Sequence, residues 1–375
     1  MTDPHLEDRH RELADRVRDL GERHLRAVGR DEENPSRRAA ELGALLGDAG
    51  LLRHAVPPPV GAMDARGALV AREGLAYFSL LAEAVYAAQA LAAHPVSAAG
   101  SEAQRGRWLP ALAAGSVLGA LALAEPEAGS DLGGVRTLAQ KDGSLFRLSG
   151  VKTWVTAAKG AGLFVVLARA SQTEGARGLS LFLVDGGAPG VAARAVETMA
   201  ALPTCELRLD AAPAVLLGDE GGGQPLVVRA IGALRPGAAG AACGLAARAL
   251  DEAVRHTLTR RQFGRPLAGF QATRLALADM HAELEAARRL ARHAAWLLDS
   301  DAKDAPREAA AARLVAAETA GRVVDRAVQL HGAQGLVRGS TVERLYREAR
   351  ALRLREGTSE GLRLELAEAI LRERR

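Results

Sequence analysis

The sequence predicts an α+β multidomain protein with an N-terminal α-helical domain, a middle β-barrel or β-sandwich domain and a C-terminal four-helix bundle. Apolar residues repeat at helical spacing near both ends of the chain, and short β-prone runs separated by Gly and Asp turns fill its middle. With 375 residues and 48% hydrophobic content, the chain can bury two or three cores. We expect the domains at residues 1–117, 118–225 and 226–375.

Helical periodicity runs from the start of the sequence to about residue 120. Apolar residues at spacings of seven, four and three form one stripe on the first expected helix, namely Leu6, Leu13, Val17 and Leu20. Asn34-Pro35-Ser36 separates this helix from the next, because the residue before a proline avoids helical geometry. A second break, Pro-Pro-Pro-Val-Gly at residues 57–61, predicts an extended loop.

The middle of the chain has the composition of short strands. Five runs rich in β-branched, aromatic or alternating apolar residues are residues 145–148, 152–156, 163–167, 179–184 and 206–209. Turn signals stand between them, such as Asp142-Gly143 and the Asp-Gly-Gly sequence at 185–187. These features predict a small barrel or sandwich.

Longer helices are expected after the three glycines at 221–223. One apolar face repeats at helical spacing through Met280, Leu284, Ala287, Ala291, Ala294 and Leu298. Pro306 opens another helix that runs toward Leu330 and stops near Gly332, since proline suits a first helical turn and glycine suits a helix end. A four-helix bundle is the simplest arrangement for these helices.

Charge and cysteine content exclude several classes of protein. The 49 basic and 45 acidic residues are interleaved along the chain, which indicates solvated helix faces with local ion pairs. The small net charge of +4 would suit an anionic ligand. Basic runs lack the interleaved aromatics of a nucleic-acid surface. Cys205 and Cys243 fit no disulfide framework and no metal spacing, so we predict a reducing compartment and no metal site.

The N-terminal segment bears on the cellular location of the protein. Residues 1–30 mix acidic and basic side chains and contain no apolar core segment, which argues against a signal or transit peptide. No run approaches the ~20 apolar residues that a membrane span needs. We therefore expect a cytoplasmic protein without a membrane span.

Five segments carry the functional information, in the order Ala-Leu-Ala-Glu-Pro-Glu-Ala-Gly-Ser-Asp (122–131), Lys-Thr-Trp-Val-Thr (152–156), Arg-Arg-Gln-Phe-Gly (260–264), Gln-Leu-His-Gly-Ala (329–333) and Arg-Leu-Arg-Glu-Gly-Thr-Ser-Glu (353–360). Each alone is ordinary: a turn, a core strand, a solvated arginine pair, a helix cap and a capped loop. Together and in this order they resemble the acyl-CoA dehydrogenase family, from about Gly100 to the C-terminus. The first hundred residues match only in their helical texture.

The resemblance implies an FAD enzyme of fatty acid metabolism. It would oxidise an acyl-CoA to the trans-2-enoyl thioester, pass electrons to an electron-transferring flavoprotein and assemble as a homotetramer, a dimer of dimers with FAD at a subunit interface. Glu356 aligns with the base of the short- and medium-chain branch and would take the α-proton, while flavin N5 would take the β-hydride. The base position of another branch, near Ala233 and Leu234, carries no carboxylate.

The resemblance also assigns cofactor-binding residues. The first two segments would lie against the flavin through Leu121, Leu123, Ala124, Gly129, Ser130, Trp154, Val155 and Thr156. Residues reaching the FAD of a neighbouring subunit would be Arg260, Arg261, Gln262, Phe263, Phe270 and Gln271; those near its adenosine would be Gln329, Gly332 and Ala333, with Thr358 and Glu360 completing the set. Trp154 would pack on the ring and Thr156 would bond near N5.

The substrate side is assigned to Ser130, Gly232, Arg235, Arg355 and Gly357. Gly232 stands where an acidic residue is frequent, and Arg355 replaces a frequent aromatic residue. Arg355 would pair with Glu356, receive a polar or carboxylated acyl group, or point to solvent or another structural partner. We further expect desolvation by the acyl chain and the flavin to raise the pKa of Glu356. The backbone N–H of the base, with a ribityl hydroxyl of FAD, would stabilise the thioester oxygen.

Two departures concern the flavin. Ala124 replaces a usual threonine and Ala333 replaces a glycine, changes that would weaken FAD binding or shift its potential; Glu127 also stands where glycine is common. These replacements leave open a second interpretation, a flavin-less interaction protein with no catalytic role. A dehydrogenase of acyl groups tethered to a carrier protein also stays open, as does a flavin oxidase or monooxygenase, although the presence of Glu356 argues against an oxidase or monooxygenase.

Overall fold

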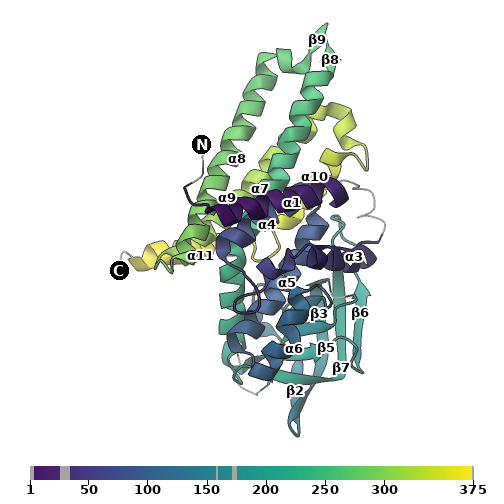
Figure 1. Cartoon of the computed structure of the whole chain (residues 1–375), viewed down its shortest axis with the longest axis vertical. Coiled ribbons are helices and arrows are strands. Elements are labelled where there is room, and N and C mark those ends of the chain that lie inside the picture. Colours follow the sequence, from purple (N-terminus) through teal and green to yellow (C-terminus); the bar gives the residue numbers. More distant parts are fainter. Residues whose placement is uncertain (1–3, 26–33, 158, 171–174, 374–375) are drawn as a thin grey trace. The chain divides into compact units, whose positions relative to one another are not determined.

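The computed structural model describes residues 4–25, 34–157, 159–170 and 175–373. The chain forms two compact units, each discontinuous in sequence (Figure 1). The first comprises Met1–Gly29, Ala65–Leu80 and Arg235–Arg375, and the second comprises Arg30–Asp64 and Leu81–Leu234. Along the chain the described elements follow the order helices, sheet, helices, which confirms the predicted fold class.

The helices before the sheet are α1 (Asp8–Leu20), α3 (Pro35–Asp48), α4 (Ala65–Phe78), α5 (Leu80–Ala99) and α6 (Glu102–Ala113). In α1 the predicted apolar stripe is buried through Leu13 and Val17. Helix α3 begins at the predicted break, with Pro35 in its first turn and the Asn34 side chain accepting the Arg37 amide. Helix α6 begins with a reciprocal pair of bonds between Ser101 and Gln104, a capping box.

The sheet in the second unit contains β1 (Gly119–Ala122), β2 (Leu138–Asp142), β3 (Leu145–Thr156), β4 (Leu163–Arg169), β5 (Leu179–Asp185), β6 (Val191–Ala195) and β7 (Thr204–Leu217). Its order is β1-β4-β2-β3-β7-β5, and β4 also pairs with β5, so five strands close into a ring. This confirms the predicted small barrel. Two predicted runs, 145–148 and 152–156, are one strand, β3, with register shifts at Leu148/Gly150 and Lys152/Val155.

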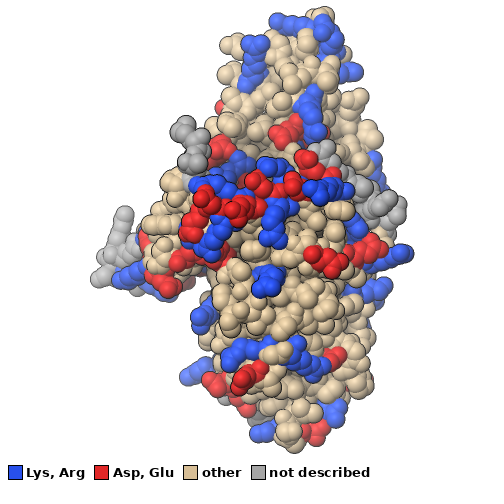
Figure 2. All heavy atoms as spheres, in the orientation of Figure 1, with Lys and Arg blue, Asp and Glu red and all other residues tan. Residues whose placement is uncertain are grey.

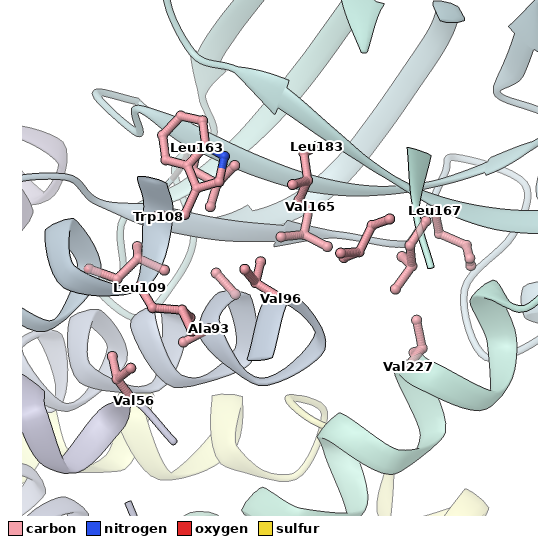
Figure 3. Close-up of a cluster of buried hydrophobic side chains, with 14 of the residues drawn as sticks. Val56, Ala93, Val96, Trp108, Leu109, Leu163, Val165, Leu167, Leu183 and Val227 are labelled. Carbon is pink, nitrogen blue, oxygen red and sulfur yellow. The ribbon is translucent and has the colours of Figure 1, made fainter. Parts of the chain in front are cut away.

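Strand β4 separates two apolar cores, because all but the last of its residues are buried. Leu163, Val165 and Leu167 face a cluster that includes Val96 of α5 and Trp108 of α6 (Figure 3). The alternate residues of β4, Phe164, Val166 and Ala168, belong to the other core together with residues of β3, β5 and β7. A strand covered on both faces reads as a continuous apolar run, as this one does.

The helices after the sheet are α7 (Gly223–Thr259), α8 (Gln271–Asp299), α9 (Ala305–His331), α10 (Thr341–Leu352) and α11 (Ser359–Glu373). A short hairpin of β8 (Arg261–Gln262) and β9 (Arg265–Pro266) connects α7 to α8 at one end of both helices (Figure 1). As predicted, α9 has proline in its first turn and ends at Gly332, where φ is 60°. The predicted apolar face of α8 is buried, except that Leu298 is only half-buried.

Glycines let α7 approach α4 closely within the first unit. A Cβ added at Gly244 would lie 1.9 Å from the backbone oxygen of Glu73, and one added at Gly240 would lie 2.5 Å from that of Leu69. At Gly237 the added Cβ would lie 2.8 Å from Cδ of Arg72. Residues without a Cβ at these positions therefore bring α4, and with it Arg72, against α7.

Helix α7 bears on the expected absence of a membrane span. It is long and apolar enough to cross a membrane by length and composition, with an 18-residue window of mean hydropathy 1.2. However, 61% of that window is buried within the fold, as in the core helix of a globular domain. Alanine and glycine supply much of its apolar character, so the sequence pattern did not indicate a membrane-length run.

Charged side chains of both signs are interleaved over α1, as predicted (Figure 2). Arg11 pairs with Asp8 at 2.5 Å and Arg18 with Asp15 at 2.6 Å, each three residues apart on the helix surface. Such exposed pairs contribute little to stability, about 0–1 kcal/mol. The similar numbers of acidic and basic residues on this face therefore keep the helix solvated.

Candidate active site

Glu356 lies in the loop between α10 and α11, in the first unit. Its φ is 54° and that of the following Gly357 is 104°, so two successive residues adopt left-handed geometry. This geometry is unfavourable for a residue with a side chain, and such residues cluster at functional sites. Arg313 of α9 holds the loop by donating to the backbone oxygens of Leu352 and, at 2.9 Å, Arg355.

The Glu356 carboxylate forms a two-point ion pair with Arg72 of α4. Nη2 of Arg72 donates to Oε1 at 2.6 Å and Nη1 donates to Oε2 at 2.9 Å. The side chains are 1% and 9% exposed, respectively, so the pair is buried. Parallel charge-assisted bonds to a planar guanidinium fix both the position and the orientation of a carboxylate.

The surroundings of Glu356 in the folded chain act on its pKa in opposite directions. Burial raises the pKa of the carboxyl, but the Arg72 guanidinium outweighs it, with help from Arg355 and Arg313, and lowers the pKa to about 2. The sequence-based expectation concerned desolvation by the acyl chain and the flavin and did not include Arg72. Glu356 is therefore ionised at neutral pH, the state that a proton acceptor requires.

The remaining predicted substrate residues have different surroundings. Nη2 of Arg355 is 4.0 Å from Oε1 of Glu356, and its side chain is 18% exposed, so it is a secondary partner of Glu356 and does not extend into solvent. Arg235 of α7 forms a two-point ion pair with Glu365 of α11, with both N–O distances 2.6 Å. At Gly232 an added Cβ would meet open space.

The first two segments assigned to the flavin come together in the second unit. The Thr153 amide of β3 donates to the backbone oxygen of Ala124 at 2.9 Å. The ammonium of Lys152 donates to the backbone oxygen of Leu123 and to Oε1 of Glu125, each at 2.8 Å. The stretch after β1 is thereby tied to β3 by backbone and side-chain bonds.

The exposed groups of this region fit an aromatic cofactor with a polar edge. Trp154 is 64% exposed and has a φ of 58°. The hydroxyl oxygen of Thr153 is buried without a hydrogen-bond partner among the residues that the structure describes. Gly129, with open space at its Cβ position, and Ser130 are exposed. An unused hydroxyl beside an accessible indole and an open backbone is a suitable place for a flavin.

The other residues assigned here are less accessible through their side chains. Val155 is 2% exposed and belongs to the core of the barrel, so only its backbone is available to a ligand. Half-buried positions are Leu121, Leu123, Ala124 and Thr156.

The third segment forms the exposed β8–β9 hairpin of the first unit. Phe263 at its tip is 93% exposed and has a φ of 48°. Its ring makes an edge contact with Phe270 at 6.2 Å, and the guanidinium of Arg265 lies 4.0 Å from the Phe270 ring. Among neighbouring residues, Arg260, Arg261, Gln262 and Gln271 are also exposed. An exposed aromatic tip flanked by arginines is suited to contact an anionic or aromatic partner.

The fourth segment lies at the C-terminal end of α9. Gln329, Gly332 and Ala333 are exposed, whereas His331 stacks on His256 of α7 with ring centroids 4.2 Å apart. Stacking fixes the end of α9 against α7.

The remaining assigned residues begin α11. The hydroxyl of Thr358 accepts the Gly361 amide at 3.0 Å, a bond typical of a helix N-terminus. The Glu360 side chain is 74% exposed and lies 3.7 Å from Arg363. Within the described ranges no group of three or more His, Cys, Asp or Glu residues could hold a metal ion.

Arg72 is the residue that the sequence analysis missed. It precedes Glu356 by 284 positions, so no local motif connects the two. A signal was nevertheless present: helical spacing puts Arg72 among the apolar residues Ala68, Leu69, Leu75 and Ala76, all of which are buried. A buried arginine needs an acidic partner.

Three family models match most of the chain in succession. Residues 7–116 match "Acyl-CoA dehydrogenase, N-terminal domain", residues 120–212 match "Acyl-CoA dehydrogenase, middle domain" and residues 221–371 match "Acyl-CoA dehydrogenase, C-terminal domain".

Individual relatives agree with the family match. The mitochondrial short-chain specific acyl-CoA dehydrogenase of Bos taurus is 33% identical over 376 residues, covering 98% of this chain and 91% of that protein. Subunit CarC of the caffeyl-CoA reductase–Etf complex of Acetobacterium woodii is 34% identical over 288 residues, covering 75% of this chain and 76% of that protein. A glutaryl-CoA dehydrogenase from Mycobacterium smegmatis, solved in complex with FADH2, has a TM-score of 0.90 at 27% identity, covering 98% of this chain and 96% of that one.

Proposed function

Because the chain belongs to the acyl-CoA dehydrogenase family, an FAD-dependent family of oxidoreductases, we propose that it oxidises an acyl-CoA thioester between Cα and Cβ with Glu356 as the base. The product would be the trans-2-enoyl thioester. The observation that carries this proposal is the ionised, nearly buried carboxylate of Glu356 in the matched C-terminal region. An ionised carboxylate held away from water is suited to take a proton from carbon.

The chain's own groups supply the acid–base part of the reaction. Glu356 takes the α-proton, and its backbone N–H donates to the thioester oxygen as charge develops there. Glu356 and Gly357 both have positive φ, so the backbone at the proposed base departs from helical geometry. When bound, FAD supplies the acceptor for the hydride that leaves Cβ.

The residues that would hold FAD come from separate parts of the chain. The region of Ala124, Ser130 and Trp154 would accept the ring, consistent with the unused Thr153 hydroxyl and the exposed indole. The β8–β9 hairpin would serve the FAD of another subunit, since Phe263 is exposed in the single chain and arginines flank it. We therefore propose a homo-oligomer, a dimer of dimers, in which two subunits complete each site.

The electron acceptor that we propose is an electron-transferring flavoprotein. A relative that covers three quarters of this chain is named as a subunit of a complex with Etf, which supports an acceptor of this kind. The cytoplasm is the proposed location, because two buried cysteines that form no disulfide within the described residues suit a reducing environment.

An anaerobic titration tests this function. The purified protein is expected to be yellow, and butyryl-, octanoyl- or glutaryl-CoA is expected to bleach its flavin absorbance without oxygen. Glu356→Gln should retain the colour and bleach about 10²–10⁴-fold more slowly. The control is Glu368→Gln on α11, whose side chain is 67% exposed and pairs only at the surface with Arg372. A colourless protein, or equal bleaching by Glu356→Gln, would contradict the proposal.

A further inference from the structure

The contact between Arg72 and Glu356 has a feature that a simple structural ion pair lacks. Both hydrogen bonds that the Glu356 carboxylate accepts come from one guanidinium, at 2.6 and 2.9 Å. Removal of that one side chain would therefore remove both of these bonds and leave the more distant Arg355 as an ionic partner. A two-point pair occupies one lone pair on each oxygen and leaves the other available to receive a proton.

From this geometry we propose that Arg72 is a positioning residue for the reaction: it keeps Glu356 ionised and fixed in the resting enzyme, and the pair weakens once Glu356 has received a proton. The inference rests on the proposed function, because it assumes that Glu356 is the base. A protonated carboxyl group cannot accept two bonds from a cation as a carboxylate does. Proton transfer to Glu356 therefore removes the carboxylate charge and weakens its ion pair with Arg72.

The position of Arg72 is built into the fold. The side chain is 1% exposed and lies on α4 against α7, where Gly237 leaves room for its Cδ. A side chain at position 237 would have to displace it, since an added Cβ would be 2.8 Å from that atom. The guanidinium thus faces Glu356 because two helices enclose it.

The other charged groups that face Glu356 are also cationic. Arg355 lies in the same loop at 4.0 Å, and Arg313 of α9 contributes through its charge. All three arginines favour the ionised carboxylate, and Arg72 has the largest effect. Burial acts in the opposite direction, so removing Arg72 leaves the raising effect of burial opposed only by the two weaker partners.

The test is the pH at which Glu356 titrates in the full-length protein. Infrared difference spectra between each protein and its Glu356→Gln derivative report the protonated carboxyl directly, without turnover. In the wild type this band should be absent above pH 4.5, because the pKa is lowered from that ordinary value. In Arg72→Gln its midpoint should move upward by at least one pH unit, a tenfold change in proton affinity, and the acid limb of kcat/KM should move with it.

Arg66→Gln provides a matched control. Arg66 lies on the same helix and is 11% exposed. It pairs with Asp299 at 2.7 Å and not with Glu356. Its replacement should leave the Glu356 midpoint unchanged. Arg72→Lys is the second variant: it keeps the charge without the fork of donors, so its midpoint should fall between those of the wild type and Arg72→Gln.

The possible results separate this inference from the proposed function. An unmoved midpoint in both Arg72 variants, or an equal shift in Arg66→Gln, overturns the positioning role even if acyl-CoA bleaches the flavin. If Arg72→Gln does not fold, the pH midpoint of Glu356 titration in Arg72→Lys alone tests the positioning role of Arg72. A shifted midpoint in a protein that no acyl-CoA bleaches would retain the electrostatic role of Arg72 and reject the dehydrogenase function.

Discussion

Two buried carboxylates differ in how they are held, and this difference is what we expect between a structural carboxylate and the proposed base. Glu125 accepts bonds from Lys152, from the amides of Arg136 and Thr137 and from the Thr137 hydroxyl. Glu356 accepts its two bonds from a single side chain. Several independent donors fix Glu125 permanently, whereas one displacement can release Glu356.

Replacement of Lys152 by methionine should destabilise the second unit strongly. The lysine is 0% exposed, and its loss leaves Glu125 as a buried charge without its counter-ion, a change of about 3–5 kcal/mol. Thermal unfolding measures the effect. Arg147→Met on the same strand is the control, because Arg147 is 43% exposed and its pair with Asp142 is worth about 0–1 kcal/mol. Similar losses of Tm in the two variants would argue against this account.

At the scale of the residue, the sequence predicts Glu356 as the base but does not describe its electrostatics. The resemblance identified the carboxylate from its neighbours in the sequence, Arg355 and Gly357 among them. The pKa depends on Arg72, which belongs to a helix that becomes adjacent only after folding. Pairings over such separations leave no periodic or spacing signal, so a buried arginine can be noticed but its partner cannot be chosen.

At the scale of the element, patterns of apolar spacing predicted the helices better than they predicted the strands. Helix α9 begins and ends where Pro306 and Gly332 indicated, since both residues act locally. Strand β3 was predicted as two runs, residues 145–148 and 152–156, and Gly150 lies between them. In the sheet this glycine is needed where the chain passes Thr137: an added Cβ would lie 2.5 Å from the threonine hydroxyl.

Helix α7 offers a direct test of close contact between elements. Gly244→Ala should lower Tm, because the new Cβ would be 1.9 Å from the Glu73 backbone oxygen and the two helices would have to separate, which costs about 1–3 kcal/mol or more. Gly321→Ala on α9 is the control. Its Cβ meets open space, and alanine is favoured over glycine in a helix by about 1 kcal/mol, so Tm should rise or stay unchanged. Equal changes in Tm in the two variants would mean that backbone contact does not limit how closely α7 and α4 pack.

At the scale of the whole molecule, the single chain exposes more large apolar side chains in its first unit than solvation favours. They include Leu258, Phe263, Leu275, Leu336, Val337 and Leu364, each at least 56% exposed. Several lie beside the segments that the resemblance assigns to a neighbouring subunit's FAD. In the proposed homo-oligomer, we expect a second copy of the chain to cover these side chains.

Phe263→Asp should weaken both assembly and flavin retention. Burial of a phenylalanine is worth about 1.5–3 kcal/mol, so the affinity between subunits should fall about 10- to 100-fold. Light scattering on dilution measures the mass, and the ratio of flavin to protein absorbance measures retained FAD. The two should fall together, since each site would use residues from two chains.

Met199→Asp is the comparison for that experiment, because Met199 is 51% exposed on the second unit and has no assigned contact with the cofactor. Its mass and its flavin content should both match the wild type. If Phe263→Asp dissociates the oligomer but keeps its FAD, the cofactor is bound within one subunit and the hairpin serves assembly alone. If it loses FAD without change of mass, Phe263 contacts the cofactor but contributes little to association, and the apolar surface around Leu275 and Leu336 must hold the subunits together.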